Sequence, residues 1–254
     1  MRPTLIIDTH THIQLCNQPI DQLIQTAQAN SVIKLINVAI DIESSQSNIK
    51  LANAYPSVIY PTIGIHPNSY HDYAHISSLN SLIKRHRPCA IGECGLDFYR
   101  DTNPPKQNQI EIFLAQLELA RTHQLPVIIH SRNANDELIE LLPRFKDITK
   151  VIHCFSSSWD IANRLNDDNT YFSFTGLITF SKKGKTVNTI KHLPMHKIML
   201  ETDCPYLTPK RYTGQSNEPS FVIEVAKKIA DIKGLPLTDV MSQTTKTAMS
   251  FFGV

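Results

Sequence analysis

Two histidines separated by one residue lie near the start of the chain, in Asp8-Thr-His10-Thr-His12. Side chains two residues apart in a strand face the same side of it, so both imidazoles can reach one metal ion. Imidazole nitrogens are common ligands of Zn²⁺ and of similar divalent ions. Because two histidines at an exposed strand end are also common without a metal, this pair indicates a metal site only together with further ligands.

Four further candidate ligands follow short apolar segments elsewhere in the chain. They are Glu93, His130, His153 and Asp203. With the histidine pair they form a set of four imidazoles and two carboxylates, which suits one or two divalent ions. A single buried histidine is more often a hydrogen-bonded core residue than a ligand. Six polar residues at the ends of apolar segments are hard to explain by packing, so the set predicts a metal centre.

The apolar segments alternate with amphipathic ones along the whole chain. The predicted strands cover residues 4–10, 34–40, 58–66, 89–96, 126–131, 150–155, 170–176 and 197–203. The predicted helices cover residues 20–29, 47–54, 76–86, 107–123, 136–145, 159–165, 187–193, 220–232 and 237–251. Repeated strand–helix units with nearly continuous apolar strands predict a parallel sheet covered by helices. We therefore predict a single-domain (β/α)8 TIM barrel over residues 1–254, with an open doubly wound sheet as the alternative.

A barrel explains how residues far apart in the sequence can meet. The carboxyl ends of its strands face one shared space, where catalytic groups collect. Asp8 and Glu201 share strand faces with His10 and Asp203, but they lie one step deeper, so we expect them to support the ligands. Cys94, Cys154 and Cys204 each follow a candidate ligand directly. Strand alternation therefore predicts that these thiols face the helices as small buried apolar groups.

Composition excludes several classes of protein. The formal charge is +2, 41% of the residues are hydrophobic, and the five cysteines show no disulfide or zinc-ribbon spacing. The apolar fraction suits a folded core, and neither a Gly-rich phosphate-binding motif nor an apolar run of about 18 residues is present. The first residues do not resemble a signal peptide. We expect a cytoplasmic protein that binds no membrane and needs no obligate protein partner.

Seven segments resemble, in order, the motif series of the TatD family, which is similar to the amidohydrolase barrels. They are residues 8–12 (DTHTH), 64–67 (GIHP), 92–100 (GECGLDFYR), 126–132 (PVIIHSR), 153–156 (HCFS), 200–207 (LETDCPYL) and 217–219 (NEP). The family contains metal-dependent deoxyribonucleases that act as exonucleases on single strands and 3′ ends. The resemblance implies a metal-dependent hydrolase of ester bonds in DNA, with single-stranded DNA or 3′ ends as substrate.

The resemblance also implies a role for each candidate ligand. His10, His12 and Asp203 would hold one divalent ion, His130 and His153 would hold a second, and Glu93 would bridge the two. Two such ions suit phosphodiester hydrolysis. We expect Asp203 to act also as general base, and the two oxygens of Glu93 suit a bridging position. The choice among Zn²⁺, Mn²⁺, Mg²⁺ and Co²⁺ stays open.

Several residues are candidates for contact with substrate. We assign His66, Arg132, Arg100 and Arg211 to substrate phosphates, although His66 could instead be a structural residue beside Pro67. Lys182, Lys183, Lys185 and Lys210 lie in loops predicted on the same face and suggest a basic rim. Phe98, Tyr99 and Tyr206 could stack on bases or pack within their loops. Ser157 stands where the family usually has Gly, and Asn68 where His is frequent, which bears on specificity.

Two other functions fit the same residues. One is a different hydrolase of the amidohydrolase superfamily, acting on an amide or a small phosphoester; it would need a closed pocket rather than several phosphate contacts. The other is a metal-binding protein without turnover. The presence of Asp203, which has an acid–base role besides ligation, favours an enzyme.

Overall fold

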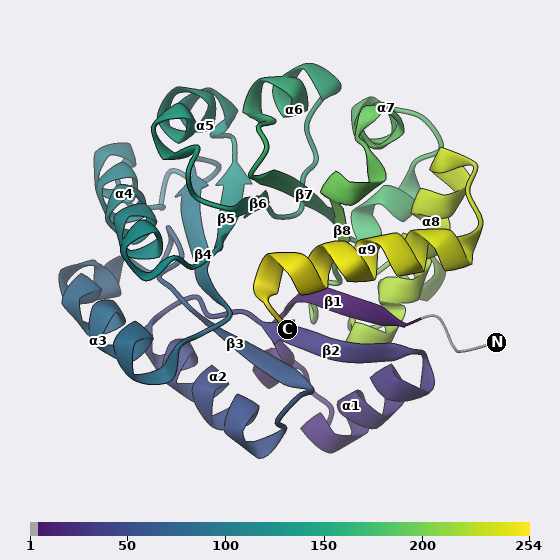
Figure 1. Ribbon diagram of the computed structural model, residues 1–254, viewed down its shortest axis with the longest axis horizontal. Coiled ribbons are helices and arrows are strands. Elements are labelled where there is room, and N and C mark those ends of the chain that lie inside the picture. The colour runs from purple at the N-terminus through teal and green to yellow at the C-terminus, as the bar shows by residue number, and fades with distance from the viewer. Residues whose placement is uncertain (1–4) are drawn as a thin grey trace.

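The computed structural model describes residues 5–254 and contains eight parallel strands arranged in sequence order (Figure 1). The strands are β1 (Ile6–Thr11), β2 (Val32–Asn37), β3 (Ile59–Ile63), β4 (Ala90–Asp97), β5 (Val127–Arg132), β6 (Lys150–Ile152), β7 (Thr170–Phe174) and β8 (Ile198–Leu200). The segment after β8 closes the ring, because the N–H of Asp203 donates to the carbonyl of His10 at 2.9 Å. The predicted (β/α)8 barrel is confirmed; Thr4, at the start of the first predicted strand, lies outside the described residues.

Eight helices surround the strands (Figure 1). They are α1 (Ile20–Ala29), α2 (Ile42–Ala54), α3 (Ile76–His86), α4 (Lys106–His123), α5 (Asn135–Leu141), α6 (Trp159–Leu165), α7 (Lys185–His192) and α8 (Val222–Lys233). Helix α2 begins earlier than predicted because Asp41 caps it, accepting from the N–H of Ser44 at 2.7 Å. Among residues 5–254, no helix is long and apolar enough to cross a membrane.

The last helix, α9 (Leu237–Phe252), closes the amino end of the barrel. Figure 1 shows it crossing beside β1, with the C-terminus near the barrel axis. Its residues Phe251 and Phe252 pack against the apolar interior formed by Ile7, Ile128 and Met199. The catalytic end of a barrel is the opposite one, so this helix supports the fold rather than the site.

Five strands (β2, β3, β6, β7 and β8) end earlier than predicted, and three of them end before a candidate site residue. β3 ends at Ile63, β6 at Ile152 and β8 at Leu200, so His66, His153 and Asp203 lie in the loops that follow. Asp203 has a positive φ of 60°, a conformation that non-glycine residues rarely adopt and that is found often at functional sites. The loop backbone, and not strand alternation, therefore sets where these three side chains point.

Gly95 allows β4 and β5 to approach beside the site. It pairs with His130 in the parallel register, and a Cβ atom on it would lie 2.1 Å from the His130 carbonyl oxygen. No side chain fits there. The close approach brings His130 next to Glu93, two residues before the glycine.

Candidate metal centre

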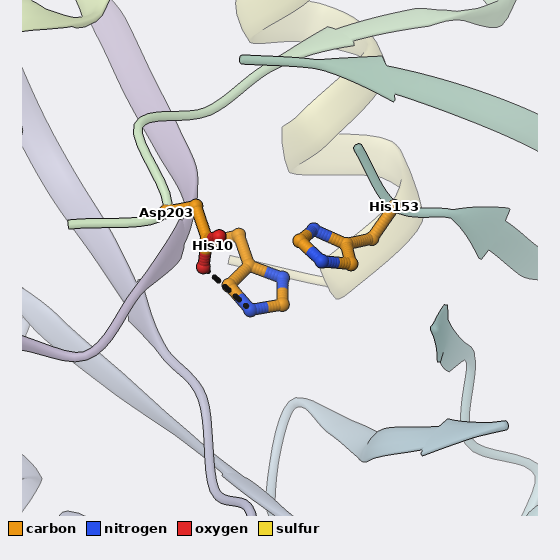
Figure 2. A group of neighbouring side chains, drawn as sticks. All are labelled: His10, His153 and Asp203. Carbon is orange, nitrogen blue, oxygen red and sulfur yellow. Dashed lines mark ion pairs between the residues drawn. The ribbon is translucent and has the colours of Figure 1, made fainter. Parts of the chain in front are cut away.

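The six predicted ligands converge at the carboxyl end of the barrel. His10 and Glu93 are buried on β1 and β4, His130 lies on β5, and the others lie just beyond strand ends. Figure 2 shows the carboxylate of Asp203 directed at His10, with the ring of His153 beside it. The rings of His10 and His153 stack with their centroids 3.8 Å apart. The barrel thus unites residues that are up to 193 positions apart in the sequence (203 − 10).

The two oxygens of Glu93 face different histidines. Oε2 lies 3.5 Å from Nε2 of His10 and 4.0 Å from Nε2 of His12. Oε1 lies 2.7 Å from Nδ1 of His130 and 3.3 Å from Nε2 of His153. A carboxylate with separate imidazoles around each oxygen has the arrangement that bridging between two cations requires.

Asp203 completes the group around His10 and His12. Its Oδ1 atom lies 3.6 Å from Nε2 of His10 and 3.4 Å from Nε2 of His12. The two imidazole nitrogens are 3.3 Å apart. Two ligand atoms about 2.1 Å from one tetrahedral ion lie about 3.4 Å apart, so these separations fit a shared divalent ion.

Three overlapping groups of side chains could each hold an ion. They are His10, His153 and Asp203; His10, His12 and Glu93; and His66, Glu93 and His130. All six predicted ligands appear among them. His66 also appears, although the sequence predicted a phosphate contact for it. Its Nε2 lies 3.8 Å from Oε1 of Glu93, and its Nδ1 accepts from the N–H of Asn68 at 3.1 Å.

Hydrogen bonds at the far side of the rings orient His12 and His153, and an ion pair lies at the far side of a third ring, that of His130. Nδ1 of His12 donates to the carbonyl of Val38 at 2.9 Å, and Nδ1 of His153 donates to Glu201 at 3.0 Å. Nε2 of His130 lies 3.4 Å from Oδ2 of Asp97. Such partners fix ring orientation in metal sites. The sequence predicted this role for Glu201 but missed Asp97, which strand alternation places on the face of Glu93.

Asp8 supports the site through the β8 loop. Its carboxylate accepts from the N–H of Thr202 at 2.9 Å and from the hydroxyl of the same residue at 2.6 Å. These bonds connect β1 to the residue before Asp203. Asp8 also accepts from the backbone N–H of His10 at 3.4 Å but bonds to no histidine ring, so it acts on the ligands through the backbone and the β8 loop.

Both carboxylates of the centre favour the ionised form. Burial raises the pKa of Glu93, but the positive charge of His153 and the hydrogen bond from His10 outweigh it and hold the pKa well below its usual value. Burial also raises the pKa of Asp203, and the hydrogen bond from His12 with the charge of His10 reverses the shift. Burial lowers the pKa of His66 to about 3. The centre therefore offers ionised carboxylates and, at His66, a neutral imidazole.

A cleft of about 400 Å³ opens from the centre to solvent. Its walls include His130, His153, Asp203, Arg132 and Tyr206. The guanidinium of Arg132 lies 3.7 Å from the ring centre of Tyr99, which holds it at the mouth of the cleft. Two other predicted phosphate contacts do not line this cleft: Arg100 is exposed on the loop after β4, and Arg211 lies 3.3 Å from Glu224. Their contact with phosphate stays a prediction.

The three cysteines that follow ligands differ in their surroundings. Cys94 packs in the layer between strands and helices as predicted, and Cys204 is fully buried. The prediction for Cys154 is wrong, because this residue lines the cleft. β6 has ended two residues earlier, and Cys154 has a φ of +48°, so alternation no longer applies. Burial raises the pKa of its thiol to about 12, so it stays protonated.

Comparison with known proteins agrees with this site. The model of the family described as TatD related DNase matches residues 7–253. The chain belongs to the TatD family. The Bacillus subtilis protein YabD, named an uncharacterized metal-dependent hydrolase, is 32% identical over 98% of this chain and 100% of its own length. A similarly named Mycoplasma genitalium protein, MG009, is 33% identical over 96% of this chain and 98% of its own.

Solved structures support the same assignment. The TatD homologue YJJV from Escherichia coli superposes with a TM-score of 0.92 at 29% identity, covering 98% of each chain. A dihydroorotase from Campylobacter jejuni, at 13% identity and a TM-score of 0.65, covers 98% of this chain and 83% of its own and shares the fold alone. The protein is therefore a metal-dependent hydrolase of the TatD family, with His, Glu and Asp clusters able to bind metal.

Proposed function

We propose that this TatD-family protein is a deoxyribonuclease that hydrolyses phosphodiester bonds of single-stranded DNA or 3′ ends, releasing nucleotides from a 3′ end with two divalent ions bound. Its action in the cytoplasm belongs to the same proposal and agrees with the free cysteines of the described chain. The observation that carries the proposal is the position of Glu93. Its two oxygens face two sets of imidazoles, which suits two ions acting on one phosphate.

His10, His12 and Asp203 would hold one ion, and His130 and His153 the other, with Glu93 between them. The ions, when bound, supply the Lewis acidity that activates water and offsets charge on phosphate oxygens. The Asp203 side chain is 14% exposed and that of Glu93 is 5% exposed. Asp203 is therefore the carboxylate open to water from the cleft, and it would accept the water proton as general base. Arg132 at the cleft mouth would bind a phosphate oxygen through two N–H groups.

The test is cleavage of end-labelled DNA by metal-loaded protein. Single- and double-stranded oligonucleotides labelled at the 5′ end are incubated with Mg²⁺, Mn²⁺, Zn²⁺ or Co²⁺. We expect a ladder that shortens from the 3′ end and a loss of about 10²–10⁴-fold in rate for Asp203→Asn. Asp231→Asn is the matched control, since that side chain is 77% exposed.

Absence of cleavage with every metal would contradict the proposal. Hydrolysis of a small amide or phosphomonoester without cleavage of DNA would support a different hydrolase of the superfamily. Internal cuts without shortening would refute the exonuclease mode and leave the deoxyribonuclease activity in place.

A further inference from the structure

A second hollow, of about 260 Å³, adjoins the metal cleft. The two share one wall, made by Cys154, Ser156 and Leu177. The hollow lies between the loop after β6, the loop after β7 and the start of α7. A polymeric substrate that extends from the metal cleft across this wall therefore enters the hollow directly. None of the residues assigned above to the metal centre lines it.

The lining combines an apolar base with cationic and hydroxyl groups. Phe155, Ile178 and Val187 are each 5% exposed and form the apolar part. Lys183 and Lys185 are exposed at its edge, and no acidic residue is among the residues of the described chain that line it. Leu177, on the shared wall, is 44% exposed. This lining suits a ligand that combines an anionic group with a ring, such as a base or a sugar, that can lie against the apolar residues.

The walls of the hollow are tied together. The hydroxyl of Thr186 donates to the backbone carbonyl of Ser156 at 3.2 Å, and the hydroxyl of Thr189 donates to the backbone carbonyl of Ser157 at 3.0 Å. These bonds hold α7 against the loop that carries His153. The hollow is thus a formed part of the site whose position relative to the metal ligands is fixed.

We propose that this hollow binds the nucleotide that neighbours the cleaved phosphate on the same DNA strand. The inference rests on the proposed function and names a subsite for it. Base or sugar would contact Leu177 and the apolar residues, since this contact removes apolar surface of both partners from water. Lys183 and Lys185 would contact the phosphate of that nucleotide. A double helix cannot place one base in the hollow without unpairing it, so the subsite favours a single strand.

The test measures kcat/KM of the wild type and of the double variant Lys183→Ala/Lys185→Ala on two phosphodiester substrates. Bis(p-nitrophenyl) phosphate carries the reacting phosphodiester but no neighbouring phosphate for the two lysines to contact, whereas a tetrathymidylate carries further phosphates along its strand. We expect kcat/KM on tetrathymidylate to fall about tenfold, mainly through KM, and that on the small ester to change less than twofold. Because two phosphate contacts are lost, the slope of log KM against log salt should decrease by about 1.4. All the substituted side chains are exposed, so folding is not at risk.

Lys191→Ala is the matched control, since that lysine is exposed on α7 and does not line the hollow. An unchanged KM for tetrathymidylate in the double variant, or an equal loss on both substrates, would overturn the subsite. A free nucleotide has the same chemistry and could occupy the hollow instead. If thymidine monophosphate inhibits the wild type but not the double variant, while the KM for the oligonucleotide is the same in both, the subsite for a DNA strand is overturned.

Binding separates the subsite from the proposed function. Fluorescence anisotropy of labelled tetrathymidylate on metal-depleted protein needs no cleavage, and we expect about tenfold weaker binding in the double variant. Weaker binding without cleavage of either ester by the wild type would support the subsite and contradict the deoxyribonuclease proposal. Equal binding by both proteins would overturn the subsite.

Discussion

Nδ1 of His153 donates a hydrogen bond of 3.0 Å to Oε1 of Glu201, the residue that follows β8. The same oxygen accepts from the N–H of Cys154 at 2.7 Å. Glu201 is 1% exposed, so both bonds are shielded from water. One carboxylate therefore fixes the ring of His153 and the turn after it, which directs Nε2 to Glu93.

We expect Glu201→Gln to weaken metal binding by about 10–100-fold, the usual effect of losing an orienting carboxylate. Glutamine keeps an oxygen acceptor but loses the charge that favours the imidazole N–H. Equilibrium dialysis with Zn²⁺ or Mn²⁺ measures the change. Glu118→Gln, at a side chain that is 57% exposed, is the control and should bind as the wild type does. Equal affinities of the two variants would contradict the role of Glu201.

Removal of metal should lower the melting temperature. Ions that bind only the folded chain stabilise it by about 2.7 kcal/mol at a free concentration 100 times Kd, which corresponds to about 5–10 °C for a chain of this size. Calorimetry before and after dialysis against a chelator checks this, and re-addition of Mn²⁺ or Zn²⁺ should restore the higher value. Equal melting temperatures would show that the ligands bind no ion in solution.

Arg132→Ala should raise KM for a single-stranded oligonucleotide about tenfold, because a charge-assisted contact to phosphate is lost. Its stacking on Tyr99 at 3.7 Å places the guanidinium before substrate arrives. Steady-state kinetics on the oligonucleotide measure the change, with Arg164→Ala on α6 as the control. A normal KM together with a lower melting temperature would instead assign Arg132 a structural role.

Gly95→Ala should destabilise the fold by more than about 3 kcal/mol, since the new Cβ would lie 2.1 Å from a backbone oxygen of the paired strand. Gly234→Ala is the matched control. That glycine also has a positive φ, of 65°, but has open space around it, so a cost of about 1 kcal/mol is expected. Urea denaturation measures both, and similar costs would contradict the close approach of β4 and β5.

Phe252→Ala should lower the free energy of unfolding by about 3–5 kcal/mol, the usual cost of removing a large buried side chain. Phe252 is 5% exposed and lies at the amino end of the barrel. The metal centre is at the opposite end, so kcat and KM of the folded fraction should not change. A changed KM at a temperature well below unfolding would show coupling between the two ends.

Local patterns in the sequence were sufficient to predict the order of the strands and helices and to single out the six candidate ligands that converge at the carboxyl end of the barrel. An apolar strand buried on both faces leaves a continuous run of apolar residues, and His10 and Glu93 interrupt such runs at their carboxyl ends. Alternation also placed Cys94 correctly in the helix layer. These predictions succeed because they depend on contacts that every strand of a barrel makes.

Tertiary structure decided what lies beyond the ends of the strands. His66 joins Glu93 and His130, Asp97 supports His130, Cys154 lines the cleft, and α9 closes the far end of the barrel. Once a strand ends, the direction of a side chain depends on the φ of its own residue and on bonds to segments distant in sequence. The bonds of Asp8 to Thr202, across 194 positions, are an example. A periodic pattern contains no information about such contacts, so only the folded chain shows them.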